Sequence, residues 1–198
     1  MARPNRIDEK RRELLPIVAR TFAELGYRRT TTAELARRCE VRENILYRIW
    51  PDKKQMFVAA IEFVFEQSRA IWTALLADDP GGSTAAERLL EYESRHHGEF
   101  GYYRIVFAGW SETDDPDIRA ALVNMYTRYH RLIRRQIAAH RSRVAGGADG
   151  PPPALTAWAV LGLGTMANIG RELGVLSDRA RRRLLAEAGG WLLDGRSR

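Results

Sequence analysis

The feature that most constrains this chain is the near absence of any pattern that forms β-strands. Runs of alternating β-branched residues are missing, and the helix formers Ala, Leu, Arg and Glu dominate throughout. Of the 198 residues, 45% are apolar, which allows a sizeable core and does not favour disorder. The sequence therefore predicts an all-α protein.

Glycine, proline and turn-forming segments mark the expected helix boundaries. The first is predicted over 13–25, with Gly26 as its C-terminal stop. Because proline is tolerated only in a first turn, Pro16 indicates either a start near Glu13 or an upstream helical arm with a kink. Longer helices are predicted over 53–77, 84–97, 102–112, 116–144, 154–173 and 178–193, with a loop at 145–153.

Residues 31–50 contain two short helical segments separated by a tight turn. Thr31, followed three residues later by Glu34, predicts a capping box at the start of the first segment. The second segment, 43–49, ends before Pro51, and Asp52 can cap the helix that follows. Apolar residues spaced to pack this pair against the first helix are Leu35, Ala36, Cys39, Val41, Leu46 and Ile49. The pattern is that of a helix-turn-helix, whose second helix enters the major groove of DNA.

Nearly all of the excess positive charge lies in the same region. The net charge is +7, and residues 1–54 hold 14 Lys and Arg against 8 Asp and Glu. The remaining residues hold 18 against 17. Such a concentrated field attracts nucleic acid or an anionic membrane face. A basic arm that can follow the minor groove or the DNA backbone contains Arg3, Arg6, Arg11 and Arg12.

The segment 14–56 resembles the N-terminal domain of TetR-family (tetracycline-repressor-like) regulators. The matching residues are Phe22, Gly26, Tyr27, Thr30, Thr31, Leu35, Ala36, Val41, Leu46, Tyr47, Trp50 and Lys53. The resemblance implies a DNA-binding domain over 1–52 and a helical ligand-binding and dimerisation domain over 53–198. It also implies a cytoplasmic transcriptional regulator, usually a repressor that a small effector releases from DNA.

Four positions depart from the family pattern. Glu40 stands where glycine is usual, so the turn must accept a strained or shifted backbone. Arg42 replaces the usual serine cap and cannot cap, although its side chain can reach a phosphate. Asn44 replaces a small residue, and Ile49 replaces a histidine or an aromatic. The fold stays credible, but an unusual operator sequence is implied.

Seven residues are candidates for DNA contact. The resemblance implies that Thr31, Tyr47 and Lys53 clamp the DNA backbone, and their chemistry suits phosphate. Arg and Asn side chains prefer guanine and adenine, respectively. The residues expected at base edges are Arg42, Asn44, Ile45 and Arg48. The alternatives are that Tyr47 is a half-buried core aromatic and that Arg48 is a solvated charge.

The helical remainder is rich in aromatic side chains interleaved with polar ones. An apolar cavity with a few polar groups suits a small-molecule site, although most of these aromatics could belong to the core. From the position of the family's cavity, the expected lining residues are Phe65, Trp72, Tyr92, His96, Tyr103, Phe107, Trp110, Tyr126 and Met166. Aromatic walls favour a bulky hydrophobic or planar effector.

The last two helices carry small and apolar residues that allow close helix approach. These are Ala159, Gly162, Leu163, Met166, Gly170, Leu184, Leu185, Ala188, Trp191 and Leu192. The family pairs these helices from two subunits, which implies a homodimer on a palindromic double-stranded operator. The alternative is that these faces belong to the core of a single chain.

Two other classes of function are compatible with parts of the sequence. A DNA-binding dimer without a small-molecule ligand fits the same sequence. A helical metal-dependent enzyme could use Glu93, His96 and His97, or Asp114, Asp115 and Asp117, but adjacent histidines point apart on a helix. We expect no enzyme activity, no metal and no cofactor. The single cysteine, Cys39, the charged N-terminus and the lack of a long apolar stretch indicate a cytoplasmic protein without a membrane segment.

Overall fold

The computed structural model describes residues 6–77, 81–144 and 150–195, and every regular element in these ranges is a helix. The predicted all-α class is therefore confirmed for this part of the chain. Arg3 of the expected basic arm and most of the expected loop at 145–153 lie outside the described residues. The chain divides into two compact units, one formed by residues up to Ser68 with Phe100–Met125, the other by Arg69–Glu99 with residues from Tyr126 onward.

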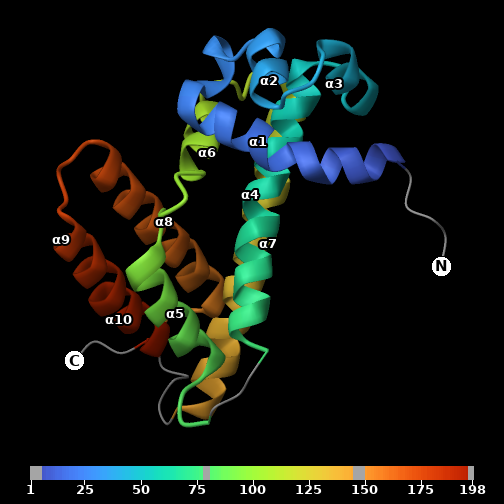
Figure 1. The fold of residues 1–198 in the computed structure, drawn as a ribbon. Helices are drawn as coiled ribbons and strands as arrows, with labels where there is room; N and C mark the ends of the chain where they lie inside the picture. Colours follow the sequence, from blue (N-terminus) through green and yellow to red (C-terminus); the bar gives the residue numbers. More distant parts are fainter. Residues whose placement is uncertain (1–5, 78–80, 145–149, 196–198) are drawn as a thin grey trace. The chain divides into compact units, whose positions relative to one another are not determined.

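The first unit contains the N-terminal helices together with a later pair. Figure 1 shows α2 and α3 next to each other, and α6 beside α1. The elements of this unit are α1 (Arg6–Arg29), α2 (Thr32–Arg38), α3 (Glu43–Ile49), the first part of α4 (Lys53–Leu75), α6 (Tyr103–Trp110) and the start of α7 (Pro116–Arg143).

Helix α1 begins at Arg6, upstream of Glu13, so of the two alternatives that Pro16 allows the upstream helical arm is the one observed. It runs through Pro16, and its one non-helical residue is Gly26, with φ 73° and ψ 169°. The first turns gain local support because Lys10 Nζ donates to Glu13 Oε1 at 2.7 Å. Gly26 therefore interrupts the helix where the sequence predicted a stop.

The core of this unit joins α1 to the two short helices. Phe22, Leu35 and Leu46, one from each of α1, α2 and α3, are fully buried. The ring of Phe22 meets the edge of Phe57 of α4 at a centroid distance of 5.0 Å. The apolar spacing of 31–50 thus holds α2 and α3 on α1, as a helix-turn-helix requires.

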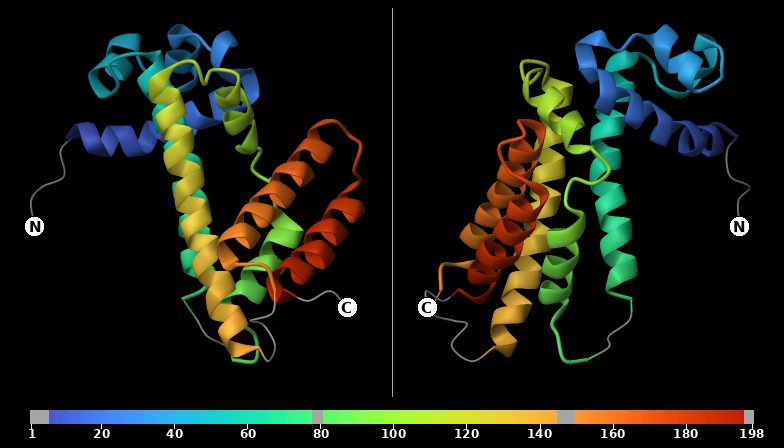
Figure 2. Two further views of the ribbon diagram at one scale, coloured as in Figure 1. Left: turned by 180° about the vertical axis from the view of Figure 1, so that it is seen from behind. Right: turned by 60° about the vertical axis from the view of Figure 1, so that its left-hand side comes forward.

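The second unit is formed by the ends of α4 and α7 and by the C-terminal helices. Helix α5 contacts the C-terminal helix, which also contacts α8, and the left view of Figure 2 shows α5 beside the C-terminal helix. The further elements are α5 (Ala85–His96), α8 (Pro153–Glu172), α9 (Asp178–Arg183), the π-helical segment η1 (Leu184–Ala188) and α10 (Gly189–Asp194). Buried Ala86, Ile137, Ala157 and Leu193 form a core cluster here.

One continuous α-helix was predicted over 178–193, but this segment is not a regular α-helix throughout. Residues Leu184–Ala188 form a π-helical turn, a rare feature inside helices. Just after it, Gly189 packs so closely on α5 that a Cβ atom would lie 2.5 Å from Leu90 Cδ1. The absence of a side chain at Gly189 lets these two helices approach.

Two buried polar side chains of α7 hold the end of α10. Arg141 donates to the carbonyl oxygens of Leu192 at 2.8 Å and Leu193 at 3.0 Å, and also to the carbonyl of Pro151. Burial lowers the pKa of the Arg141 guanidinium. The neighbouring His140 contacts Asp194 Oδ1 at 3.1 Å. These contacts satisfy carbonyl groups that a helix C-terminus leaves unpaired.

Candidate nucleic-acid interface

Helix α3 is anchored by one face and exposes the other. Leu46 is fully buried, whereas Arg42, Asn44, Tyr47 and Arg48 are exposed. Ile45, the remaining residue expected to reach base edges, is half-buried. The residues predicted to read DNA therefore lie together at the open surface of α3 and its first turn.

The turn between α2 and α3 has the strained backbone that the sequence analysis predicted for Glu40. Its φ of 54° is the only positive value among the non-glycine residues that the structure describes. The turn is held by a bond from Val41 N to Ala36 O at 3.0 Å. The left-handed conformation costs a residue with a Cβ more than it costs glycine.

The start of α2 is capped by Thr31, but the predicted capping box is only half formed. Thr31 Oγ1 accepts from Glu34 N at 3.1 Å. The Glu34 carboxylate instead binds Arg37, at 2.8 and 2.9 Å, and Arg38, at 2.6 Å. These bonds lower the pKa of Glu34 to about 2, with Arg37 the larger cause. Two guanidinium groups one turn further on outcompete the single backbone N–H of the cap.

Tyr47 is 46% exposed. Its hydroxyl donates to Thr32 Oγ1 at 3.2 Å, which links α3 to the first residue of α2. A phenol oxygen keeps lone pairs and the hydroxyl proton can rotate, so this contact leaves the group able to engage a phosphate.

Lys53 does more than face solvent at the start of α4. Its ammonium group donates to the carbonyl oxygens of Tyr27 and Thr30, both at 3.1 Å, and lies 4.5 Å from the centre of the Tyr27 ring. An ammonium group has three donors, so one N–H is left by these two bonds. Asp52 caps α4 as predicted, because Gln55 N donates to Asp52 Oδ1 at 2.7 Å.

The acidic residues near 114–117 form ion pairs and a helix cap. Lys54 Nζ lies 2.6 Å from Asp117 Oδ2 and 3.4 Å from Asp115 Oδ2. Asp115 Oδ1 accepts from the backbone N of Asp117 at 2.9 Å and of Ile118 at 3.3 Å, which caps α7. Over the described ranges, no group of three or more His, Cys, Asp or Glu side chains could hold a metal ion.

The nine residues expected to line an effector cavity are distributed over both units. In α6, Phe107 contacts Tyr103 and Trp110 at ring distances of 5.5 and 5.3 Å. In the second unit, Met166 is 54% exposed and His96 is also exposed. Phe65 belongs to the first unit, and Trp72, Tyr92 and Tyr126 belong to the second. Their role as lining residues stays a prediction.

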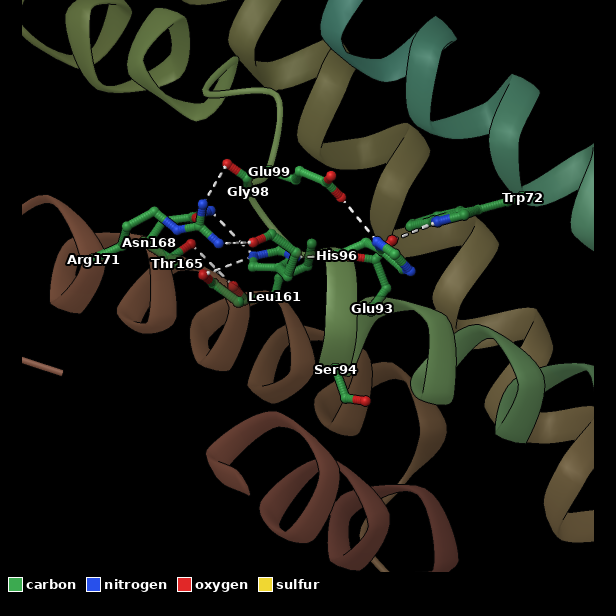
Figure 3. Close-up of polar contacts among 12 residues, drawn as sticks. Trp72, Glu93, Ser94, His96, Gly98, Glu99, Leu161, Thr165, Asn168 and Arg171 are labelled. Atoms are coloured by element: carbon green, nitrogen blue, oxygen red, sulfur yellow. Dashed lines mark hydrogen bonds and ion pairs between the residues drawn. The ribbon is translucent and has the colours of Figure 1, made fainter. Parts of the chain in front are cut away.

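A polar cluster between α5 and α8 was not anticipated as a unit. Trp72 Nε1 donates to Glu93 Oε1 at 2.7 Å, and Glu93 Oε2 lies 2.7 Å from His97 Nδ1. His97 Nε2 in turn lies 3.1 Å from Asn168 Nδ2. Figure 3 shows Trp72, Glu93 and Asn168 on α4, α5 and α8. The nominated His96 instead pairs with Glu99 at 2.8 Å and stacks on Tyr92. The spacing of Glu93 and His97, four residues apart on one helix, was the signal available in the sequence.

Large apolar side chains are exposed on α8 and α10. Trp158 and Met166 of α8 are 50% and 54% exposed, and Trp191 of α10 is 60% exposed. Two members of the expected dimerisation face point elsewhere. Gly170 packs on Leu176 of its own chain, and Leu185 is buried. The dimerisation face itself stays a prediction.

Leu35 of α2 and Leu46 of α3 are buried, while Arg42 and Arg48 are exposed around α3, which is the arrangement of a DNA-binding helix-turn-helix. Residues 19–60 match the sequence profile of the family described as bacterial regulatory proteins, tetR family. The segment 19–60, which contains the helix-turn-helix, therefore carries the sequence pattern of that family's N-terminal domain.

Solved structures of similar fold cover almost the whole chain. A TetR-family regulator from Cytophaga hutchinsonii superimposes with a TM-score of 0.78, at 14% identity over 98% of each chain. A protein from Saccharomonospora viridis, described as a transcriptional regulator in complex with choline, gives 0.74 at 20% identity over 91% of this chain and 95% of its own. Reduced NemR from E. coli gives 0.74 at 19% identity over 92% and 96%.

No curated protein matches the chain in sequence. Among the helices of the described ranges, none combines the length and the apolar character that crossing a membrane demands.

Proposed function

We propose that this chain is a TetR-family regulator, and specifically a cytoplasmic, ligand-responsive repressor without catalytic activity. It binds a palindromic operator as a homodimer, and a small hydrophobic effector releases it. The DNA-binding domain comprises residues 1–52 and the regulatory domain residues 53–198. The observation that carries the DNA-binding part is the exposure of Arg42, Asn44, Tyr47 and Arg48 around a buried Leu46.

The seven candidate residues divide by chemistry into two roles. Arg42, Asn44 and Arg48 carry hydrogen-bond donors that can reach base edges, and half-buried Ile45 can meet a thymine methyl group. The backbone clamp uses the Tyr47 hydroxyl, Lys53 and the N-terminal end of α2 at Thr31. Lys53 is supported by its position: two bonds to the end of α1 hold the ammonium group in place.

Dimerisation is proposed through the exposed apolar side chains of α8 and α10. Trp158, Met166 and Trp191 are each at least half exposed, which is unusual for large apolar groups on neighbouring helices of a monomer. Gly162 of α8 has open space where a side chain would stand, so a second helix can approach there. A two-fold dimer would present two α3 helices to half-sites about one or two helical turns apart.

The proposed effector is a small molecule that the regulatory domain binds. Support comes from the choline complex of the Saccharomonospora viridis protein, which has this fold and holds a small molecule. By linkage, an effector releases DNA only to the extent that it prefers the state that does not bind DNA. The competing function is a DNA-binding dimer that responds to no ligand.

Selection of bound DNA from a random duplex pool tests the DNA-binding part. We expect a palindromic sequence whose affinity falls steeply with salt concentration. Enrichment of a non-palindromic sequence would contradict binding as a two-fold dimer. If no duplex is retained at low ionic strength, the proposed DNA binding is wrong. A thermal-shift screen of hydrophobic compounds, followed by measurement of operator affinity, separates the ligand-responsive repressor from the ligand-independent alternative.

A further inference from the structure

The turn that joins α6 to α7 brings three carboxylates to basic residues at the end of α1 and the start of α4. Glu112 Oε1 lies 2.7 Å from Arg28 Nε at the end of α1. At the start of α4, Lys54 Nζ lies 2.6 Å from Asp117 Oδ2 and 3.4 Å from Asp115 Oδ2. Glu112, Asp115 and Asp117 form the acidic turn, and all five residues belong to the first unit.

The carboxylates of the acidic turn are held in position by contacts of their own. Asp115 Oδ1 accepts from the backbone N of Asp117 at 2.9 Å and of Ile118 at 3.3 Å, which leaves Oδ2 for Lys54. Gln55 Nε2 of α4 donates to Asp117 Oδ2 at 3.5 Å. Helix α6, which precedes the turn, packs on α1. The acidic turn is thus fixed to both α1 and α4.

The acidic turn lies close to Lys53, which is proposed to bind a DNA phosphate. In both views of Figure 2, the turn between α6 and α7 lies at the same end of the first unit as α2 and α3. Lys53 Nζ lies 4.5 Å from the centre of the Tyr27 ring. Burial raises the pKa of Tyr27, and the negative charges of Asp115 and Glu112 raise it further. The field of the acidic turn therefore reaches the ring on which Lys53 lies.

The ion pairs of the acidic turn decide whether Lys54 is available to DNA. Lys54 follows Lys53 directly, and a lysine carries its ammonium group on a flexible four-carbon stem that can reach neighbouring phosphates. In the folded chain two carboxylates hold this group instead. The side chains of Lys54, Asp115 and Asp117 are 30%, 32% and 48% exposed. Ion pairs this exposed are weak, so a DNA phosphate can compete with them for the ammonium group.

We propose that the acidic turn lowers the affinity of this protein for DNA by holding Lys54 away from the phosphate backbone. This autoinhibitory contact goes beyond the proposed function and rests on it, because it presupposes DNA binding. A phosphate must displace Asp115 and Asp117 from Lys54 and must also approach their negative charge. Since phosphates carry no base identity, the effect is the same on every DNA sequence.

The test removes two carboxylates and keeps the shape of their side chains. In the double variant Asp115→Asn/Asp117→Asn, the amide oxygen at position 115 can still accept the backbone N–H groups that cap α7. We expect the affinity for the selected operator and for an unrelated duplex to rise by about two- to fivefold, the range of exposed ion pairs. The salt slope of binding should become steeper by about one unit, because the released Lys54 displaces one more counterion. Fluorescence anisotropy titrations over a range of sodium chloride concentrations measure both quantities.

Two controls separate the release of Lys54 from a general change of charge. Asp114→Asn removes one charge from the same turn, but Asp114 is exposed and has no hydrogen bond or ion pair with the described residues. It should therefore leave the salt slope unchanged. Lys54→Met should leave the slope of the wild type unchanged and should abolish the gain when it is added to the double variant.

A double variant with the affinity and salt slope of the wild type would overturn the proposal. So would a gain that Asp114→Asn reproduces or that Lys54→Met does not reverse. Thermal unfolding shows whether each variant is folded, and if the double variant is not, Asp117→Asn alone, which keeps the cap at Asp115, decides in its place. Binding by the wild type without a gain in the variant rejects only the autoinhibitory contact, whereas no binding by either protein rejects the proposed DNA binding as well.

Discussion

The ammonium group of Lys53 donates to the backbone carbonyl of Tyr27 at 3.1 Å and lies 4.5 Å from the centre of its ring. Lys53, which is proposed to bind the DNA backbone, therefore also links α4 to the end of α1. Both roles can be measured in one variant, because one changes stability and the other changes the salt dependence of binding.

Lys53→Met should lower the free energy of unfolding by about 1–2 kcal/mol, since it removes charge-assisted bonds to two carbonyls. It should also lower the salt slope of DNA binding by about one unit. Denaturant unfolding and salt-dependent retardation assays measure the two effects. Lys10→Met, at a surface ion pair, is the control and should change stability by less than about 0.5 kcal/mol. A loss of stability with an unchanged salt slope of DNA binding would mean that Lys53 stabilises the fold but does not contact DNA.

Glu40→Gly should raise the free energy of unfolding by about 0.5–1 kcal/mol, because glycine accepts the φ of 54° without the steric cost of a Cβ. Glu40→Ala removes the same charge but keeps the Cβ, so it should not stabilise the protein. Equal stability changes in the two variants would mean that charge, and not backbone strain, dominates at this turn.

Arg48→Ala should change the preference for the base at one operator position by about 1–3 kcal/mol, since a guanidinium that reads a base edge discriminates by that amount. Binding to a library of operator variants measures the preference position by position. Arg37→Ala serves as the control, because Arg37 is exposed on α2 but binds Glu34. An unchanged sequence preference in Arg48→Ala would remove Arg48 from the base-reading set.

Met166→Glu should weaken the dimer at least about tenfold, because a charge would be buried at the proposed subunit contact. Sedimentation velocity over a range of protein concentrations measures the dissociation constant. Val123→Glu places the same charge at an exposed apolar residue of α7 and should leave the dimer unchanged. A wild-type dissociation constant in Met166→Glu would move the interface away from this face of α8.

Arg141→Met should lower the free energy of unfolding by about 3 kcal/mol, since it leaves buried carbonyl groups at the end of α10 without donors. The exposed neighbour Arg143 provides the control, and Arg143→Met should be nearly neutral. Calorimetry or denaturant unfolding measures both. A small loss in Arg141→Met would indicate that water replaces the guanidinium.

The helix-turn-helix could be predicted from local signals because they act within about one helical turn. Thr31 caps α2, Asp52 caps α4, and α3 covers the residues expected from its spacing before Pro51. The strained turn at Glu40 follows from the same kind of evidence, since any residue with a Cβ carries that cost. The start of α1 was less predictable, because Pro16 is compatible with a helix that begins near Glu13 and with one that begins upstream, and the helix begins at Arg6.

The amino-acid sequence alone therefore determined the all-α class, the helix-turn-helix and the residues exposed on α3. Only the folded chain decided the partners of its polar side chains. His97 rather than His96 meets α8, Arg171 reaches the end of α5, and Arg141 reaches residues about 50 positions away. Periodicity specifies which side of a helix a residue occupies, but the identity of the group opposite depends on contacts between segments that are remote in sequence.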